Sequence, residues 1–161
     1  KIPQPIIMKN GSKIMSLIDG SKKMSKSDPN EGSRINLLDS PEIISKKIKR
    51  AKSDSYVGLE FNNPERSESR NLLMIYSILS GKEISQCENE FSETGWGSFK
   101  KLITEQLIES LNPIQEKYKV LINDPYQLNK ILLEGKGKAE CLANKTLNRV
   151  KSKLGFFEME K

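Results

Sequence analysis

The sequence predicts a mainly α-helical protein, a helical bundle preceded by a short strand and a loop. Apolar residues recur at helical spacing through most of residues 41–154. Two of these stretches begin with Ser-Pro or Asp-Pro and another ends at a glycine, as helices commonly begin and end. The first 40 residues instead hold short apolar pieces separated by a run rich in Gly, Ser, Lys and Asp.

The N-terminal part is predicted to be a strand-and-loop fragment. Residues 1–10 contain two prolines and are expected to be extended. Ile14, Met15 and Leu17 predict a short strand of mixed exposure. Residues 19–31 (DGSKKMSKSDPNE) predict a loop, because no periodic apolar face runs through them.

Three helices are predicted in the middle of the chain, over residues 41–52, 67–80 and 84–91. The first has Ser40 as its N-cap, Pro41 in its first turn and a basic outer face. The second is rich in apolar residues and is expected to be buried, with Gly81 as its C-cap. Residues 53–63 are compatible with a loop or a small hairpin.

Two longer helices complete the predicted bundle, over residues 98–123 and from residue 124 onwards. Pro113 is expected to kink or break the first of them, because it has no N–H and clashes with the preceding turn. Gly135 and Gly137 each weaken the second by about 1 kcal/mol relative to alanine. The buried side of this last helix is predicted to consist of Leu128, Ile131, Leu132, Leu142, Leu147, Val150 and Leu154.

The composition excludes several kinds of chemistry. The 161 residues contain no histidine, which excludes Ser-His-Asp and Cys-His catalysis within this chain. Cys87 and Cys141 are too few for a zinc site and are expected to be reduced thiols, so no metal ligand is predicted. No apolar run approaches the roughly 18 residues of a membrane span, and residues 1–10 do not resemble a signal peptide. We therefore expect a soluble, cytoplasmic protein without a membrane segment.

The positive charge is concentrated near the N-terminus. The whole chain carries a net charge of +6, whereas residues 1–53 alone, with 12 basic and 5 acidic side chains, carry +7. This distribution favours a localised anion site attached to an ordinary helical body.

The densest part of this charge is the run SKKMSKS at residues 21–27, with three lysines and three serines. Ammonium and hydroxyl groups, together with backbone N–H groups, suit a mobile loop that binds polyphosphate. Met24 is the only apolar residue in the run and is expected to pin the loop to the core. From composition alone, a solvated loop without function is the favoured interpretation, and no Walker-type P-loop motif is present.

The motif KMSKS at residues 23–27 resembles the signature loop of the class I aminoacyl-tRNA synthetases. Its flanks narrow the resemblance. The tract IMSLIDGSKKMSKSDPN at 14–30, followed in order by NLLMIYSILSGK and LNPIQEKY, is similar to the C-terminal half of bacterial-type tryptophanyl-tRNA synthetases. The similarity extends from about residue 1 to residue 156.

The resemblance implies that tryptophan is activated by ATP to an adenylate and then transferred to tRNA(Trp). Lys23 and Lys26 would contact the departing phosphates as catalytic residues, and Lys26 would be the more direct ligand. Ser25 would donate a hydrogen bond to the phosphates, Met24 would position the loop, and the main chain at Ile14 would meet the adenine. The implied ATP-binding residues are Ile14, Met15, Lys23, Met24, Ser25, Lys26 and Ser27.

The resemblance also implies an organisation and partners. Residues 1–40 would end a Rossmann-type catalytic domain, and residues 41–161 would form a helical, anticodon-binding domain whose last helix packs back on the catalytic domain. Mg²⁺ would arrive with the ATP, and most of the L-tryptophan pocket would lie in the N-terminal half of the complete enzyme. That enzyme would be a homodimer, and the 161 residues alone would be inactive.

Two departures from the family pattern concern the hinge between these domains. Lys52 stands before Ser53-Asp54 where an aliphatic residue is usual, and residues 67–70 replace a Pro-Gly turn.

Two other functions stay open, a non-catalytic helical RNA-binding module and a structural helical bundle. The basic helix over 41–52 fits either a tRNA contact or a solvated face. Of the aromatic residues, Phe99 and Tyr118 are expected in the core, and Trp96 is the one open to base stacking.

Overall fold

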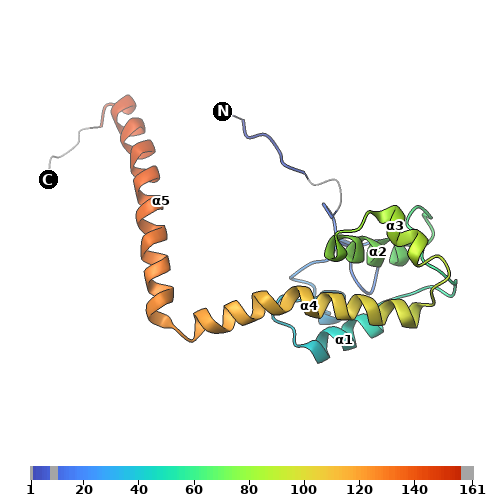
Figure 1. The fold of residues 1–161 in the computed structure, drawn as a ribbon. Helices are drawn as coiled ribbons and strands as arrows, with labels where there is room; N and C mark the ends of the chain where they lie inside the picture. Colours follow the sequence, from blue (N-terminus) through green and yellow to red (C-terminus); the bar gives the residue numbers. More distant parts are fainter. Residues whose placement is uncertain (1, 8–10, 157–161) are drawn as a thin grey trace. The chain divides into compact units, whose positions relative to one another are not determined.

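The fold is mainly helical, as predicted. The computed structural model describes residues 2–7 and 11–156. Its elements, in order, are the 3-10 helix η1 (Glu31–Ser33) and the α-helices α1 (Pro41–Arg50), α2 (Ser67–Ser80), α3 (Ile84–Glu90), α4 (Trp96–Ile122) and α5 (Pro125–Leu154) (Figure 1).

The strand predicted around residues 14–17 is wrong in its extent. Met15 and Lys23 form a single antiparallel bridge, and the described residues contain no β-strand. The pairing stops because the backbone turns to other partners at Leu17, whose N–H donates to the Ser33 carbonyl at 2.9 Å and whose carbonyl accepts from the Lys52 N–H at 2.8 Å. The chain is therefore held in place here by scattered hydrogen bonds rather than by a sheet.

The helix boundaries follow the predicted ranges closely. α2 has the predicted ends, and Gly81 closes it in the left-handed conformation at φ 70°. α1 begins at Pro41, with the Ser40 hydroxyl accepting from the Ile43 N–H at 3.4 Å. α3 is closed at its start by a capping box between Glu83 and Gln86. Local capping chemistry thus sets these ends.

Pro113 was predicted to kink or break the helix, and no break occurs, because α4 is one continuous helix from Trp96 to Ile122. The proline removes one N–H, but the turn that follows it is anchored by a side chain. The Gln115 amide donates to the carbonyls of Leu37 and Asp39, at 2.9 and 3.0 Å. These tertiary bonds hold the residues beyond the proline in helical register.

Two compact units make up the chain, residues 1–115 and residues 116–161. The first contains the loop region, α1, α2, α3 and most of α4. Its core is a continuous apolar cluster, comprising Leu17, Ile44, Ile48, Ala51, Leu59, Leu72, Leu73, Tyr76, Cys87, Phe91, Phe99, Ile103, Leu107 and Leu111. Phe91 is central to it, with its ring 4.9 Å from that of Tyr76 and 4.8 Å from that of Phe99, both edge-on. The predicted domain boundary after residue 40 concerns the complete protein and stays a prediction.

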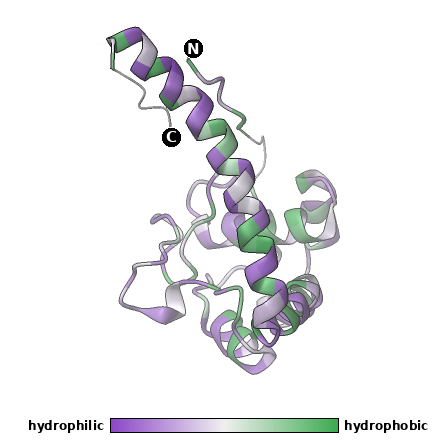
Figure 2. Cartoon of the chain, turned by 90° about the vertical axis from the view of Figure 1, so that its left-hand side faces the viewer, coloured by the Kyte–Doolittle hydropathy of each residue, from purple (hydrophilic) through white to green (hydrophobic). Residues whose placement is uncertain are grey.

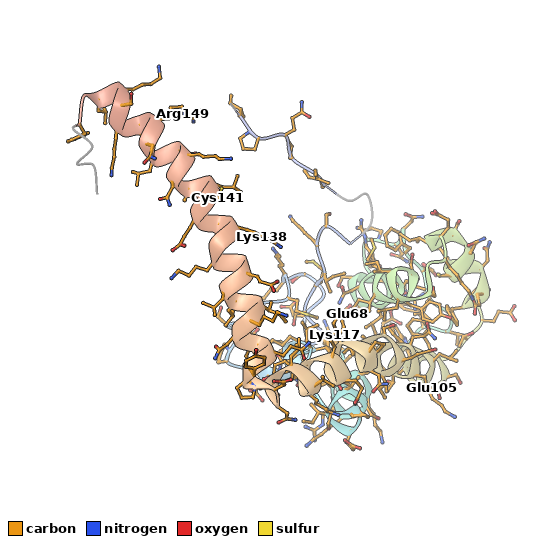
Figure 3. All side chains as sticks on the ribbon, turned by 60° about the vertical axis from the view of Figure 1, so that its left-hand side comes forward. Glu68, Glu105, Lys117, Lys138, Cys141 and Arg149 are labelled. Carbon is orange, nitrogen blue, oxygen red and sulfur yellow. The ribbon has the colours of Figure 1, made fainter. Side chains whose placement is uncertain are left out.

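The second unit contains the C-terminal end of α4 and the whole of α5. The buried side predicted for the last helix is wrong for this structure, since α5 has no buried residue. Its apolar residues run along the helix (Figure 2), and its side chains, with Lys138, Cys141 and Arg149 labelled, extend outward from it (Figure 3). Leu142 is 69% exposed. One long helix offers no second layer against which an apolar stripe can be buried.

One member of the basic face predicted for α1 is not solvated. Lys47 is buried and forms an ion pair with Asp39 at 2.5 Å, in which neither side chain is more than 10% exposed. Burial raises the pKa of Asp39, but the hydrogen bonds from Lys47 and Asn36 more than offset it, so the pKa lies below its ordinary 3.8. Asp54 behaves in the same way, because bonds from Arg66 and Trp96 outweigh its burial.

We expect the folded state to lose stability when the pH falls below about 4. A depressed folded-state pKa stabilises the protein fully above the unfolded pKa, here 3.8, and this contribution disappears as the pH falls through the lowered value. Urea unfolding between pH 6 and pH 2.5 measures the effect. Asp39→Asn should flatten the dependence, since an amide does not titrate, and an unchanged slope in this variant would exclude Asp39 as a contributor.

Candidate functional site

The residues predicted to bind phosphate lie on a loop that leaves and rejoins one short stem. The Ser16 N–H donates to the Lys22 carbonyl at 2.8 Å, and the Met24 N–H donates to the Ile14 carbonyl at 2.9 Å. Met24 is partly buried against the apolar core, which confirms the anchoring role predicted for it. The backbone of residues 14–16 thereby determines where the loop begins and ends.

The tip of this loop presents lysine and serine side chains to solvent. The side chains of Lys23, Ser25, Lys26 and Ser27 are all exposed. Ser25 and Ser27 lie within hydrogen-bonding distance of each other, with their hydroxyl oxygens 3.1 Å apart. Within the described part of the chain, no carboxylate forms an ion pair with Lys23 or Lys26. Their two positive charges are therefore free for an anionic ligand.

Lys22 differs from Lys23 and Lys26, because its positive charge is neutralised by a nearby carboxylate. Its ammonium lies 3.2 Å from the Asp19 carboxylate. Asp19 also accepts from the Ser21 hydroxyl at 2.6 Å and from the Ser21 N–H at 3.1 Å. These bonds from Ser21, together with that from Lys22, lower the pKa of Asp19 to about 2. Lys22 is thus a solvated neighbour of the loop, held by its own carboxylate.

The returning arm of the loop is closed by residues that the sequence did not single out. The Asn30 N–H donates to the Asp28 carboxylate at 2.8 Å, a local turn typical of aspartate. The Arg34 guanidinium then donates to the Asp28 carbonyl at 2.7 Å. Arg34 is separated from the motif by a polar stretch, and its spacing alone carries no signal for this contact.

The leading arm of the loop rests on the N-terminus of α2. A Cβ added at Gly20 would lie 2.7 Å from the Ser67 hydroxyl and 2.8 Å from the Ser67 carbonyl carbon, so only glycine fits this approach. Beside it, Lys52 pairs with Glu68 at 2.8 Å, and Glu68 is labelled in Figure 3. The two departures from the family pattern, at residue 52 and at residues 67–70, thus contact each other.

The aromatic residues fall into three different environments. Phe99 is fully buried, as predicted. Tyr118 is 45% exposed, so its predicted place in the core is wrong, because the apolar face of α4 leaves the core after Leu111. Trp96 is half-buried, and its indole N–H donates to the Asp54 carboxylate at 3.1 Å. The nearby Lys100 ammonium donates to the Ala51 carbonyl at 2.6 Å, and burial lowers its pKa.

The described residues offer neither a metal-binding cluster nor a membrane-spanning helix. They contain no group of three or more His, Cys, Asp or Glu side chains placed to hold a metal ion. None of the helices over these residues is long and apolar enough to cross a membrane. Cys87 is buried and Cys141 is exposed, and both are free thiols.

Comparison with known proteins places these features in a family. The sequence model described as tRNA synthetases class I (W and Y) matches residues 1–112, which include the whole loop, its stem and helices α1 to α3. The chain belongs to this family. The matched region covers nearly all of the first compact unit and includes the loop at residues 23–27.

Tryptophan–tRNA ligases are among the relatives of this class I synthetase chain. That of Prochlorococcus marinus subsp. pastoris is 80% identical over all 161 residues, which correspond to 48% of its length. The chloroplastic/mitochondrial ligase of Arabidopsis thaliana is 49% identical over 98% of this chain and 39% of its own. The crystal structure of tryptophanyl-tRNA synthetase from Mycoplasma pneumoniae superposes with a TM-score of 0.82 at 30% identity, covering 93% of this chain and 45% of that one. This synthetase chain spans about half the length of the curated relatives that it matches.

Proposed function

We propose that this chain is the KMSKS-bearing part of a tryptophan–tRNA ligase, which activates tryptophan with ATP and transfers it to tRNA(Trp). One observation carries the proposal. Lys23 and Lys26 are exposed, free of ion pairs within the described residues, and held on a stem that belongs to the region matched by the family. The names of the relatives support tryptophan as the amino acid.

In the proposed reaction a tryptophan carboxylate oxygen bonds to the α-phosphorus of ATP while the bond from that phosphorus to the pyrophosphate oxygen breaks. The products are tryptophanyl-adenylate and pyrophosphate. Negative charge accumulates on the leaving group, and Lys23 and Lys26 neutralise it. Ser25 and Ser27 add hydroxyl donors from the same loop. Met24 keeps the loop attached to the core throughout.

The adenosine end of ATP would lie against the stem rather than the loop tip. Ile14 and Met15 form the stem backbone, and the main chain at Ile14, with Met15 beside it, is the proposed contact for the adenine. Mg²⁺ would be carried by the ATP phosphates, since no cluster of metal ligands is found among the described residues. Most of the tryptophan pocket would be supplied by the rest of the complete ligase. We further propose that residues 1–40 end its Rossmann-type domain, that residues 41–161 contact tRNA, and that the complete ligase is a cytoplasmic homodimer.

A hybrid ligase tests the proposal. It is made by replacing the matching segment of the Prochlorococcus marinus ligase with this chain. We expect tryptophan-dependent exchange of pyrophosphate into ATP and charging of tRNA(Trp) by the hybrid, and neither activity from the 161 residues alone. A folded hybrid that catalyses no exchange would refute the proposal.

A second candidate, a non-catalytic RNA-binding module, is favoured by one observation. Lys46, Lys49 and Arg50 are exposed together on α1, within the segment that carries the positive charge. If the hybrid is inactive, filter binding of this chain to tRNA at two salt concentrations distinguishes this candidate from a purely structural bundle. A binding constant whose logarithm falls steeply with the logarithm of the salt concentration, by an amount that grows with the number of phosphates contacted, identifies the RNA-binding module.

A further inference from the structure

The stem of the loop is held from its other side by one buried side chain of α2. The Met15 N–H donates to the Asn71 amide oxygen at 2.8 Å, and the Asn71 amide nitrogen donates to the Met15 carbonyl at 2.8 Å. Asn71 is 4% exposed and lies 56 residues from Met15 in the sequence. A side-chain amide that pairs with both polar groups of one residue reproduces what a neighbouring strand would offer.

The two edges of the stem are therefore occupied in alternation. Ile14 and Ser16 use their backbone groups on one edge, where they bond to Met24 and Lys22 at the two ends of the loop. Met15 lies between them, and its groups point to the opposite edge, as alternating residues of an extended chain do. No β-strand forms in the described residues. The Asn71 amide instead makes the two hydrogen bonds to Met15 that a strand on this edge of the stem would make.

We propose that Asn71 is a positioning residue for the phosphate-binding loop. Asn71 fixes the position of the Met15 peptide and thereby the orientation of the stem. The stem in turn determines where Lys23 and Lys26 lie relative to the ATP phosphates. This inference rests on the proposed function. Catalysis is sensitive to such placement, because a displacement of about 1 Å costs on the order of a hundredfold in rate.

Two variants remove the contact in different ways. Asn71→Leu removes both hydrogen bonds, whereas Asn71→Asp keeps the acceptor for the Met15 N–H and places a carboxylate oxygen against the Met15 carbonyl. Ser77→Ala is the matched control. Ser77 is also buried in α2, and its hydroxyl donates to the Lys82 carbonyl at 2.7 Å, a partly buried bond that has no connection with the loop.

We expect kcat/KM for ATP in pyrophosphate exchange by the hybrid ligase to fall about ten- to a hundredfold in both Asn71 variants, with an unchanged Kd for tryptophan. Trypsin should also cleave after Lys22, Lys23 or Lys26 several times faster than in the unsubstituted hybrid, relative to cleavage elsewhere. Ser77→Ala should lower the melting temperature while leaving both readouts unchanged.

The outcomes separate this inference from the proposed function. If the Asn71 variants behave like Ser77→Ala in kcat/KM and in loop cleavage, Asn71 is merely structural and the inference is overturned. If Asn71→Leu does not fold, Asn71→Asp alone decides, since it retains one of the two bonds. If the unsubstituted hybrid catalyses no exchange, the proposed function fails, and the cleavage rates by themselves decide whether Asn71 holds the loop.

Discussion

Replacing Lys26 with alanine is expected to slow adenylate formation by the hybrid ligase about a hundred- to a thousandfold. Lys26 is exposed on the loop tip, and no carboxylate among the described residues competes for its charge. Its ammonium is therefore available to the departing pyrophosphate, whose charge develops only in the transition state. Pre-steady-state pyrophosphate exchange measures the rate, and equilibrium titration measures the affinity for tryptophan, which should stay unchanged.

Lys22→Ala is the matched control for this experiment. Lys22 carries the same charge four residues earlier, but its ammonium is paired with Asp19 at 3.2 Å and its side chain is 79% exposed. Its removal should change the exchange rate by less than a factor of about three, as expected for a solvated surface charge. Equal effects of the two substitutions would show that the loop contributes only general positive charge, and an unchanged rate in Lys26→Ala would remove Lys26 from its role.

Replacing Asp54 with alanine is expected to destabilise the fold by about 3 kcal/mol. The Arg66 side chain is 2% exposed, and its guanidinium donates to Asp54 through Nε at 2.8 Å and through one terminal nitrogen at 3.0 Å. Without the carboxylate, the buried cation keeps one hydrogen bond among the described residues, to the Gly58 carbonyl at 2.7 Å, and a contact with the half-exposed Glu60 carboxylate at 3.2 Å. Urea unfolding at neutral pH measures the loss in the free energy of unfolding. The fluorescence of Trp96, the only tryptophan, reports on this region, because its indole N–H donates to Asp54.

Glu60→Ala supplies the comparison for this cluster. Glu60 lies 3.2 Å from the remaining terminal nitrogen of Arg66, but the contact lacks hydrogen-bond geometry and the Glu60 side chain is 51% exposed. Solvent screens such a pair, so its loss should change the free energy of unfolding by no more than about 1 kcal/mol. The assignment of Asp54 as the partner of Arg66 would be wrong if Glu60→Ala proved the more damaging of the two.

The helices were predictable because their signals are local. Ser40-Pro41 and Gly81 mark ends that depend on capping and on a left-handed residue, and both occur where the sequence places them. The continuity of α4 through Pro113 and the reduction of the expected strand near Met15 to a single bridge were not predictable in this way. Each depends on a distant partner, the carbonyls that meet Gln115 in the first case and the competing bonds of Leu17 in the second.

The same distinction between local signals and distant partners applies to the candidate site. The motif at residues 23–27 and its flanks single out the loop by their resemblance to a family signature, whereas a dense run of lysine and serine alone also fits a solvated loop. The contrast between a paired Lys22 and a free Lys26 depends on the geometry of Asp19, which composition does not reveal. Lys47 shows the opposite case, a lysine expected on a solvated face that is buried against Asp39.

The sequence by itself therefore determined the helical class of this protein, most helix ends and the loop that we propose binds phosphate, because periodicity, capping and motif are properties of neighbouring residues. Only the tertiary structure decided which apolar faces are buried and which charges are free. α5 has the periodicity of a buried helix yet buries nothing, since burial requires a second surface. In the sequence, Asn71 looks like an ordinary helix residue. It bonds to Met15 only because folding brings its amide oxygen within 2.8 Å of the N–H of a residue 56 positions earlier.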